Sequence, residues 1–275
     1  GTPDDLDTNH IHSAPFRHVN MPEAWDITCG SPAVKIGVID TDLHSISDPI
    51  MDDLRCKIEY LDCNGPNCGT LPSTAFSHGF AVASHACAQP NNGIKAHARI
   101  GAGAGYNSQL YFSNHPFGLW TTTAQRMVSE GVKVINMSFY TRCSTGSALE
   151  QTFIDEITAK GVVVVAAAGN GQLHCGPTNS VHQYLYPASY ENVISVTAVP
   201  GYTYFTTLTN ADQMFWQGTT LTHNDKVDII SIGAATSFAS PVIAGVVALI
   251  KSVNPNLKTP DIIDLLQTTG VNITS

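Results

Sequence analysis

Four polar residues with complementary acid–base chemistry are spread along this 275-residue chain, and each lies beside an apolar segment. They are Asp40, His78, Asn170 and Ser237. A hydroxyl group attacks a carbonyl efficiently when a base takes its proton, an acid orients that base and a donor stabilises the oxyanion. Each residue alone could be structural, but together the four indicate nucleophilic acyl chemistry.

Ser237 stands at the predicted start of an apolar, alanine-rich helix that continues to about Ile250. The free N–H groups and the dipole of a helix N-terminus favour developing negative charge, which suits a nucleophile. We expect Pro241 in the first turn of this helix, where its missing N–H would cost no hydrogen bond. The simpler alternative is that Ser237 only caps a buried helix.

Asp40 and His78 are also expected at the ends of regular elements. Asp40 follows the apolar, β-branched segment 34–39, which predicts a buried central strand. Open α/β sheets place their chemistry at the carboxyl ends of such strands. Ser77 is a natural N-cap, so His78 is expected in the first turn of a buried helix that extends to about His85.

The segments between these residues predict how the chain positions them. Further strands are expected at 109–113, 132–138, 162–168, 193–199 and 227–232, and helices at 22–26, 116–130, 147–160 and from Thr259 onwards. Strands alternating with helices predict a three-layer α/β fold, in which helices cover both faces of a mostly parallel central sheet. We see no repeat or linker, so we expect a single domain over 1–275, with residues 1–20 as a polar N-terminal arm.

The composition restricts the classes of partner. A hydrophobic content of 43% argues against disorder, and the net charge of −9 disfavours nucleic acid. No uninterrupted apolar stretch reaches about 18 residues, so no membrane-spanning segment is expected. The glycine-rich segment 101–105 raises the alternative of nucleotide binding, but Tyr106 stands where the last glycine of that fingerprint belongs.

Seven cysteines favour an exported protein with some disulfides, and their odd number leaves at least one without a partner in the chain. Three of them, Cys56, Cys63 and Cys68, share a polar segment that we expect to be a loop, where a disulfide would fit. A zinc site is the alternative there, but the segment lacks the usual CxxC spacing. The remaining cysteines are Cys29, Cys87, Cys143 and Cys175.

The motifs around the four polar residues resemble those of the subtilisin-like serine proteases, or subtilases. Their Asp motif is matched by Val38-Ile39-Asp40-Thr41, their His motif by His78-Gly79 with Val82-Ala83, and their Ser motif by Thr236-Ser237-Phe238-Ala239-Ser240-Pro241. The segments 134–138 and 166–170 resemble the strands that line the family's substrate pocket. The resemblance extends from Ala24 to the last helix, which is nearly the whole chain.

This resemblance implies a serine endopeptidase that hydrolyses peptide bonds of proteins or peptides through an acyl-enzyme. Ser237 would be the nucleophile, His78 the general base and then general acid, and Asp40 the residue that orients His78. Asn170 and the Ser237 N–H would stabilise the oxyanion. The chemistry would need no metal or other cofactor.

The resemblance also implies which residues bind the substrate. They lie at two strand ends and at the floor of a specificity pocket, and comprise Ser138, Phe139, Tyr140, Ala167, Ala168, Gly169 and Leu185. Leu185, which precedes Tyr186-Pro187, occupies a position where glycine is common in the family. We therefore expect small or medium apolar residues before the scissile bond, in preference to large aromatic ones.

Several positions depart from the family's motifs. Asp42 replaces a glycine, Ala81 replaces a second histidine, and the segments 139–141 and 231–233 also differ. These changes affect the cleft and not the triad. They motivate one alternative, a catalytically silent binding domain, and a peptide ligase or cyclase on the same scaffold is another.

The resemblance further implies an exported enzyme, either secreted or periplasmic, made as a zymogen. The chain begins at Gly1 without a signal peptide, so we expect a processed or artificial start and an N-terminal propeptide removed before it. The segment 91–94 resembles the family's calcium-binding loop, with Asp52 or Asp53 as a partner carboxylate. An ordinary turn is the alternative.

Overall fold

The computed structural model describes residues 16, 19–63, 68–91, 102–114, 117–171, 181–199, 215–216 and 219–270. The centre of the fold is a seven-stranded sheet in which all neighbouring strands are parallel. The strands are β1 (Lys35–Ile39), β3 (Ile58–Asp62), β5 (Gln109–Ser113), β6 (Val132–Met137), β8 (Val163–Ala167), β10 (Val193–Val199) and β13 (Ile229–Ile232). Their order across the sheet is β13-β10-β8-β6-β1-β5-β3.

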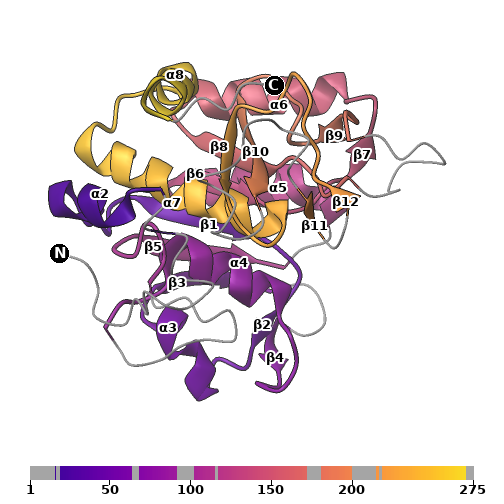
Figure 1. The fold of residues 1–275 in the computed structure, drawn as a ribbon. Coiled ribbons are helices and arrows are strands. Elements are labelled where there is room, and N and C mark those ends of the chain that lie inside the picture. The colour runs from indigo at the N-terminus through magenta and orange to yellow at the C-terminus, as the bar shows by residue number, and fades with distance from the viewer. Residues whose placement is uncertain are drawn as a thin grey trace.

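Helices cover both faces of this sheet (Figure 1). One face packs against α4 (His78–Cys87), α7 (Thr236–Val253) and α8 (Thr259–Thr269), and the other against α5 (Trp120–Ser129) and α6 (Ala148–Ala159). The fold also contains two short helices, α2 (Met21–Ile27) and α3 (Asp52–Arg55). The predicted α/β fold with a parallel, doubly covered sheet is confirmed.

Successive residues of the central strands pack into opposite layers, as the period of two requires. In β1, Val38 contacts the core beneath α4 and α7, whereas Ile39 belongs to the core beneath α5 and α6. In β6, Val134 and Ile135 divide in the same way. Because both faces are buried, these strands appear in the sequence as continuous apolar runs.

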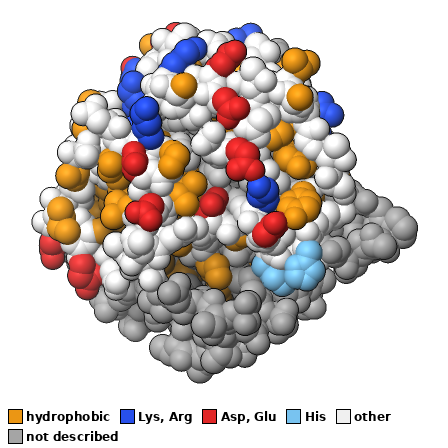
Figure 2. Space-filling model, turned by 90° about the horizontal axis from the view of Figure 1, so that it is seen from above, with side chains coloured by type: hydrophobic (Ala, Val, Ile, Leu, Met, Phe, Trp, Pro, Cys, Tyr) orange, Lys and Arg blue, Asp and Glu red, His pale blue; other side chains and the backbone are white. Residues whose placement is uncertain are grey.

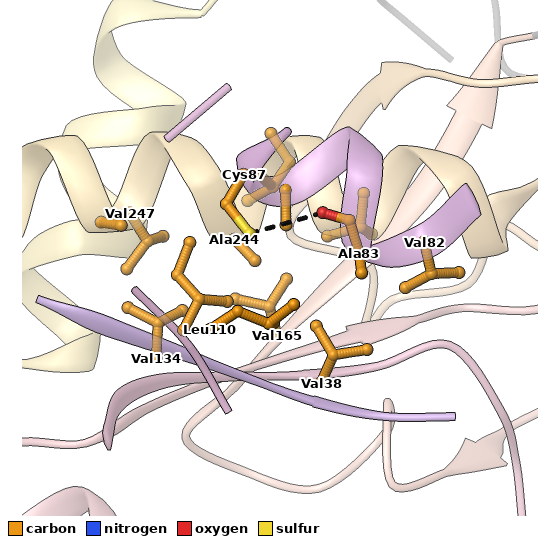
Figure 3. Close-up of a cluster of buried hydrophobic side chains, with 14 of the residues drawn as sticks. Val38, Val82, Ala83, Cys87, Leu110, Val134, Val165, Ala244 and Val247 are labelled. Carbon is orange, nitrogen blue, oxygen red and sulfur yellow. Dashed lines mark hydrogen bonds between the residues drawn. The ribbon is translucent and has the colours of Figure 1, made fainter. Parts of the chain in front are cut away.

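The layer beneath α4 and α7 is closely packed (Figure 3). Val82 and Cys87 of α4 and Val247 of α7 lie over Leu110 and Val165 of the sheet. Burial raises the pKa of the Cys87 thiol to about 12, so this cysteine is a packing residue and not a nucleophile.

Helix α7 approaches α4 and the glycine-rich segment closely at Gly245. A Cβ atom on Gly245 would lie 2.8 Å from Ala86 O of α4 and 2.6 Å from both Ala104 Cβ and Gly105 N, so only glycine fits there. The backbone of the glycine-rich segment pairs with the end of α4, since Ala104 N donates to His85 O at 3.0 Å. The described part of this segment, 102–105, therefore packs against both α4 and α7.

Helix α7 satisfies the length and composition of a membrane-spanning helix, but 67% of it is buried inside the domain. It is the central core helix. The outer surface in Figure 2 mixes acidic, basic and apolar side chains.

The observed secondary structure differs from the expected one at 58–62 and at 117–119. The segment around Cys63 was expected to be a loop, but Ile58–Asp62 forms the edge strand β3, parallel to β5. Three of its five side chains are exposed, so the segment lacks the apolar run typical of the buried strands. The helix expected over 116–130 begins at Trp120, after a 3-10 turn at Phe117–Leu119.

The described cysteines occur in two states. Cys63 and Cys143 each belong to a disulfide. Cys29, Cys56 and Cys87 are free thiols. Cys175 and most of the N-terminal arm lie outside the described residues.

Candidate active site

Asp40 is the residue directly after β1, and its side chain is only 1% exposed. Its N–H donates to Ser113 O at 3.0 Å, which extends the pairing with β5 by one residue. Oδ1 accepts hydrogen bonds from His78 Nδ1 at 2.7 Å and from Thr41 N at 2.8 Å. The end of the central strand thus fixes a buried carboxylate against the imidazole ring.

His78 is the first residue of α4, as the sequence predicted. The N-cap Ser77 accepts a hydrogen bond from Phe80 N at 3.0 Å, and its hydroxyl donates to Asp42 O at 3.0 Å. A Cβ atom on Gly79 would lie 2.4 Å from Asp42 O, so glycine is needed beside the histidine. The cap and this close contact together hold His78 next to Asp40.

Two opposed effects set the basicity of His78. Burial, the largest influence, lowers its pKa, but the hydrogen bond to Asp40 and the charges of Asp40 and Asp42 raise it, and the net pKa lies above the ordinary value. Asp42, two residues after Asp40, is the second source of negative charge near the ring. The imidazolium form of His78 is therefore more stable than that of an ordinary histidine. The side chain is 31% exposed, so a reactant can reach it.

Ser237 is the second residue of α7. Only three residues separate β13 from this helix, and a Cβ atom on Gly233 would lie 2.6 Å from Ala239 N, so the turn is tight. The ring of Phe238 lies 5.5 Å from the ring of His78, which brings the start of α7 beside the imidazole. Among the described residues, the Ser237 hydroxyl donates to Ser138 O at 3.4 Å and not to His78.

Asn170 follows β8 and faces the start of α7. Its Oδ1 accepts hydrogen bonds from Thr236 N at 3.0 Å and from Thr236 Oγ1 at 2.9 Å. A backbone N–H can only meet an acceptor, so this pair fixes which atom of the amide is oxygen. Both N–H groups of the amide are therefore turned away from Thr236.

The expected substrate-binding residues gather at the carboxyl ends of β6 and β8, around the first turn of α7. Ala167, Ala168 and Ser138 are buried there. Gly169 adopts a φ of +115°, and a Cβ atom on it would lie 2.4 Å from Leu185 Cδ1. The Leu185 side chain, 3% exposed, thus packs directly against the end of the β8 segment.

The two remaining residues of the expected substrate-binding set, Phe139 and Tyr140, have different surroundings from these. Phe139 is 9% exposed, and its ring stacks on Phe117 with centroids 4.1 Å apart, within the core beneath α5 and α6. Only its backbone remains for a substrate. Tyr140 is half-buried, just before the antiparallel pair β7 (Arg142–Cys143) and β9 (Leu185–Tyr186).

The expectation for Pro241 is wrong. Helix α7 begins at Thr236, so Pro241 is its sixth residue and not part of the first turn. A residue at that position would normally donate its N–H to Ser237 O, four residues earlier. Proline has no N–H, and the nucleophile candidate's own carbonyl loses this helical partner.

The sequence assigned no individual role to three residues that organise the site: Thr236, which holds Asn170, and Asn136 and Ser240, which lie buried near Ser237. A proline four residues after Ser237 was the available signal for the last two, because it implies an unsatisfied carbonyl.

The sequence named a calcium-like segment at 91–94 and the carboxylates of Asp52 and Asp53 as candidate metal ligands. Residues 92–94 of the calcium-like segment lie outside the described residues, and Asp52 forms an ion pair with Arg55. Within the described ranges, no group of three or more His, Cys, Asp or Glu side chains could hold a metal ion.

Comparison with known proteins identifies the scaffold. The family model described as the Subtilase family matches residues 31–273. The thermophilic serine proteinase of Bacillus sp. (strain AK1) is 31% identical over 246 residues, which cover 85% of this chain and 56% of that protein. Subtilisin DY of Bacillus licheniformis is 33% identical over 146 residues, which cover 52% of this chain and 51% of the relative. The matches thus span about half the length of these relatives.

Solved structures share the fold at lower identity. A protease from Pseudoalteromonas arctica PAMC 21717 superimposes with a TM-score of 0.68 at 21% identity, over 92% of this chain and 87% of that one. The prenylagaramide maturation protease PagA gives a TM-score of 0.62 at 18% identity, over 91% and 88%. The family model, which covers most of the chain, and this shared architecture lead to one conclusion: the chain belongs to the subtilase family.

Proposed function

We propose that this domain is a serine endopeptidase, which hydrolyses peptide bonds of protein or peptide substrates through an acyl-enzyme. The observation that carries the proposal is the 2.7 Å hydrogen bond between Asp40 and His78, beside the helix N-terminus that bears Ser237. Family membership supports the same reaction class.

In the proposed reaction, His78 takes the proton of the Ser237 hydroxyl as the oxygen attacks the scissile carbonyl. Nδ1 of His78 donates to Asp40, so Nε2 is the nitrogen that accepts the proton. For this step the Ser237 hydroxyl turns from Ser138 O towards the imidazole. Catalytic hydrogen bonds often form fully only when substrate is bound. His78 then gives the proton to the leaving amine, and water repeats the sequence to release the acid.

The negative charge of the tetrahedral intermediate requires donors that are already oriented. We assign this role to the Asn170 amide, whose oxygen is held by Thr236, and to the backbone N–H of Ser237. The helix dipole of α7 acts in the same direction. All of this chemistry uses the chain's own residues and needs no cofactor.

We further propose that Leu185 restricts the specificity pocket, so that small or medium apolar residues precede the scissile bond. Its packing against Gly169 supports this assignment. Secretion or periplasmic export, and activation by removal of a propeptide, are also proposed. The disulfides to which Cys63 and Cys143 each belong support an oxidising compartment.

The direct test is covalent labelling of the folded protein with a fluorophosphonate probe, followed by mass spectrometry of the labelled peptide. We expect the label on Ser237 and none on the Ser237→Ala variant. A correctly folded protein that takes no label would favour the catalytically silent binding domain. Adding an amine nucleophile to a peptide substrate distinguishes hydrolysis from peptide ligation, because only a ligase transfers the acyl group mainly to the amine.

A further inference from the structure

The backbone carbonyl of Ser237 receives a hydrogen bond from an unusual donor. Pro241 has no N–H to give it, and the proline ring also crowds the carbonyl four residues earlier in a helix. Ser138 Oγ, which lies 99 residues away in the sequence, donates to Ser237 O at 2.9 Å instead. A hydroxyl at the end of β6 thus replaces the missing helical donor.

The Ser138 hydroxyl is itself held in a buried network. Asn136 Nδ2 donates to Ser138 Oγ at 3.0 Å, and Ser240 Oγ donates to Asn136 Oδ1 at 2.7 Å. The exposed fractions of Asn136, Ser138 and Ser240 are 0%, 6% and 0%. Such a network is stable only when its members are satisfied, so it holds each hydroxyl in one orientation.

The protons can be assigned by counting donors. Ser240 uses its single hydroxyl proton towards Asn136 Oδ1, which is an acceptor only. Ser138 therefore has one proton to place, between Ser237 O at 2.9 Å and Ser240 Oγ at 3.2 Å. Ser237 O is the better acceptor, because it is the nearer atom and lacks its helical donor.

We propose that Ser138 is a positioning residue for the nucleophile, and that its hydroxyl acts by holding the Ser237 carbonyl that Pro241 leaves unsatisfied. Asn136 and Ser240 orient that hydroxyl. This inference rests on the proposed role of Ser237 as the nucleophile. It assigns the side chain of Ser138 a role separate from any contact between its backbone and a substrate.

A double-mutant cycle tests the inference, because Pro241→Ala restores an N–H at the position that normally serves Ser237 O. With Pro241 present, Ser138→Ala should lower kcat by about ten-fold, since a small displacement of a reacting group costs up to ~10²-fold. KM should change by less than about two-fold, because the Ser138 backbone is unchanged. In the Pro241→Ala background, the same Ser138→Ala change should lower kcat by less than about three-fold.

Ser231→Ala is the matched control. Ser231 is a buried serine on β13, and among the described residues its hydroxyl has no hydrogen-bond partner. Its removal should have the same effect in both backgrounds. An equal loss of kcat for Ser138→Ala in both backgrounds, or an effect chiefly on KM, would overturn the inference.

A second readout does not depend on turnover. The Ser237→Ala variant keeps the backbone carbonyl, so the same cycle can be followed by urea unfolding in that inactive background. We expect Ser138→Ala to lower the urea midpoint more with Pro241 than with Ala at that position. Additive midpoints would overturn only this inference, whereas a wild-type protein without turnover would overturn the proposed function and the catalytic part of the inference together.

Discussion

Thr236 donates two hydrogen bonds to one oxygen of Asn170, from its backbone N–H at 3.0 Å and from its hydroxyl at 2.9 Å. The same hydroxyl accepts a hydrogen bond from Gly169 N at 3.2 Å. The residue before the proposed nucleophile thus ties the end of the β8 segment to the start of α7. The proposed oxyanion donor and the proposed nucleophile are held by one backbone segment.

Loss of the Asn170 amide should reduce the rate and not the binding of substrate. We expect Asn170→Ala to lower kcat by about 10²–10³, with KM nearly unchanged, because the contact strengthens only in the transition state. Steady-state kinetics on one peptide substrate measures both constants. If KM rose while kcat held, Asn170 would instead be a residue that binds the ground state.

The charge of Asp42 should be visible in the pH dependence. The protonated form of His78 is inactive as a base, so kcat/KM should rise as pH increases through the pKa of His78. Because Asp42 raises this pKa, Asp42→Asn should lower it and shift the acid limb of the profile to lower pH. The exposed Asp264→Asn variant is the control, and its limb should coincide with that of the wild type. An unmoved limb in Asp42→Asn would rule out this tuning.

The packing of Leu185 against Gly169 predicts a change of specificity. Leu185→Gly should open space at the pocket floor, where a large side chain would otherwise be overpacked at a cost of about 1–3 kcal/mol. We expect the ratio of kcat/KM for a Phe substrate to that for an Ala substrate to rise by at least ~10-fold. The ratio is measured within each variant, which cancels differences in folded fraction. A wild-type preference for Phe would show that Leu185 does not limit the pocket.

The raised pKa of Asp228 predicts that the stability of the protein depends on pH, independently of catalysis. Burial raises its pKa from 3.8 to about 6, although Ser195 N donates to the carboxylate at 2.8 Å. The folded state binds this proton more tightly than the unfolded state. The protonated Asp228 therefore adds to the free energy of unfolding below pH 3.8, and this addition is lost as pH rises through 6.

Asp228→Asn should therefore stabilise the protein above pH 6 by on the order of 1 kcal/mol and change little at pH 4, since one pKa unit corresponds to ~1.4 kcal/mol and the group is partly solvated. Thermal unfolding at both pH values measures the difference. The exposed Glu156→Gln variant should show no such pH dependence. A destabilised Asp228→Asn at pH 8 would contradict this account.

Local signals in the sequence determined much of the architecture. The apolar run at 34–39 predicted β1, and Asp40 lies directly after that strand. Ser77 predicted the start of α4 at His78, and Gly161, with φ of +83°, follows α6 as expected. Such features depend on the propensities and hydrogen bonds of neighbouring residues, so they can be read without knowing the fold.

Tertiary structure alone decided how the site is held together. Ser138 reaches Ser237 O across 99 residues, and Asn170 meets Thr236 across 66. The edge strand β3 escaped prediction because its exposed side chains carry no apolar pattern. Such hydrogen bonds, and the pairing of a polar edge strand, form only when particular elements pack together. A local sequence pattern does not show which elements will do so.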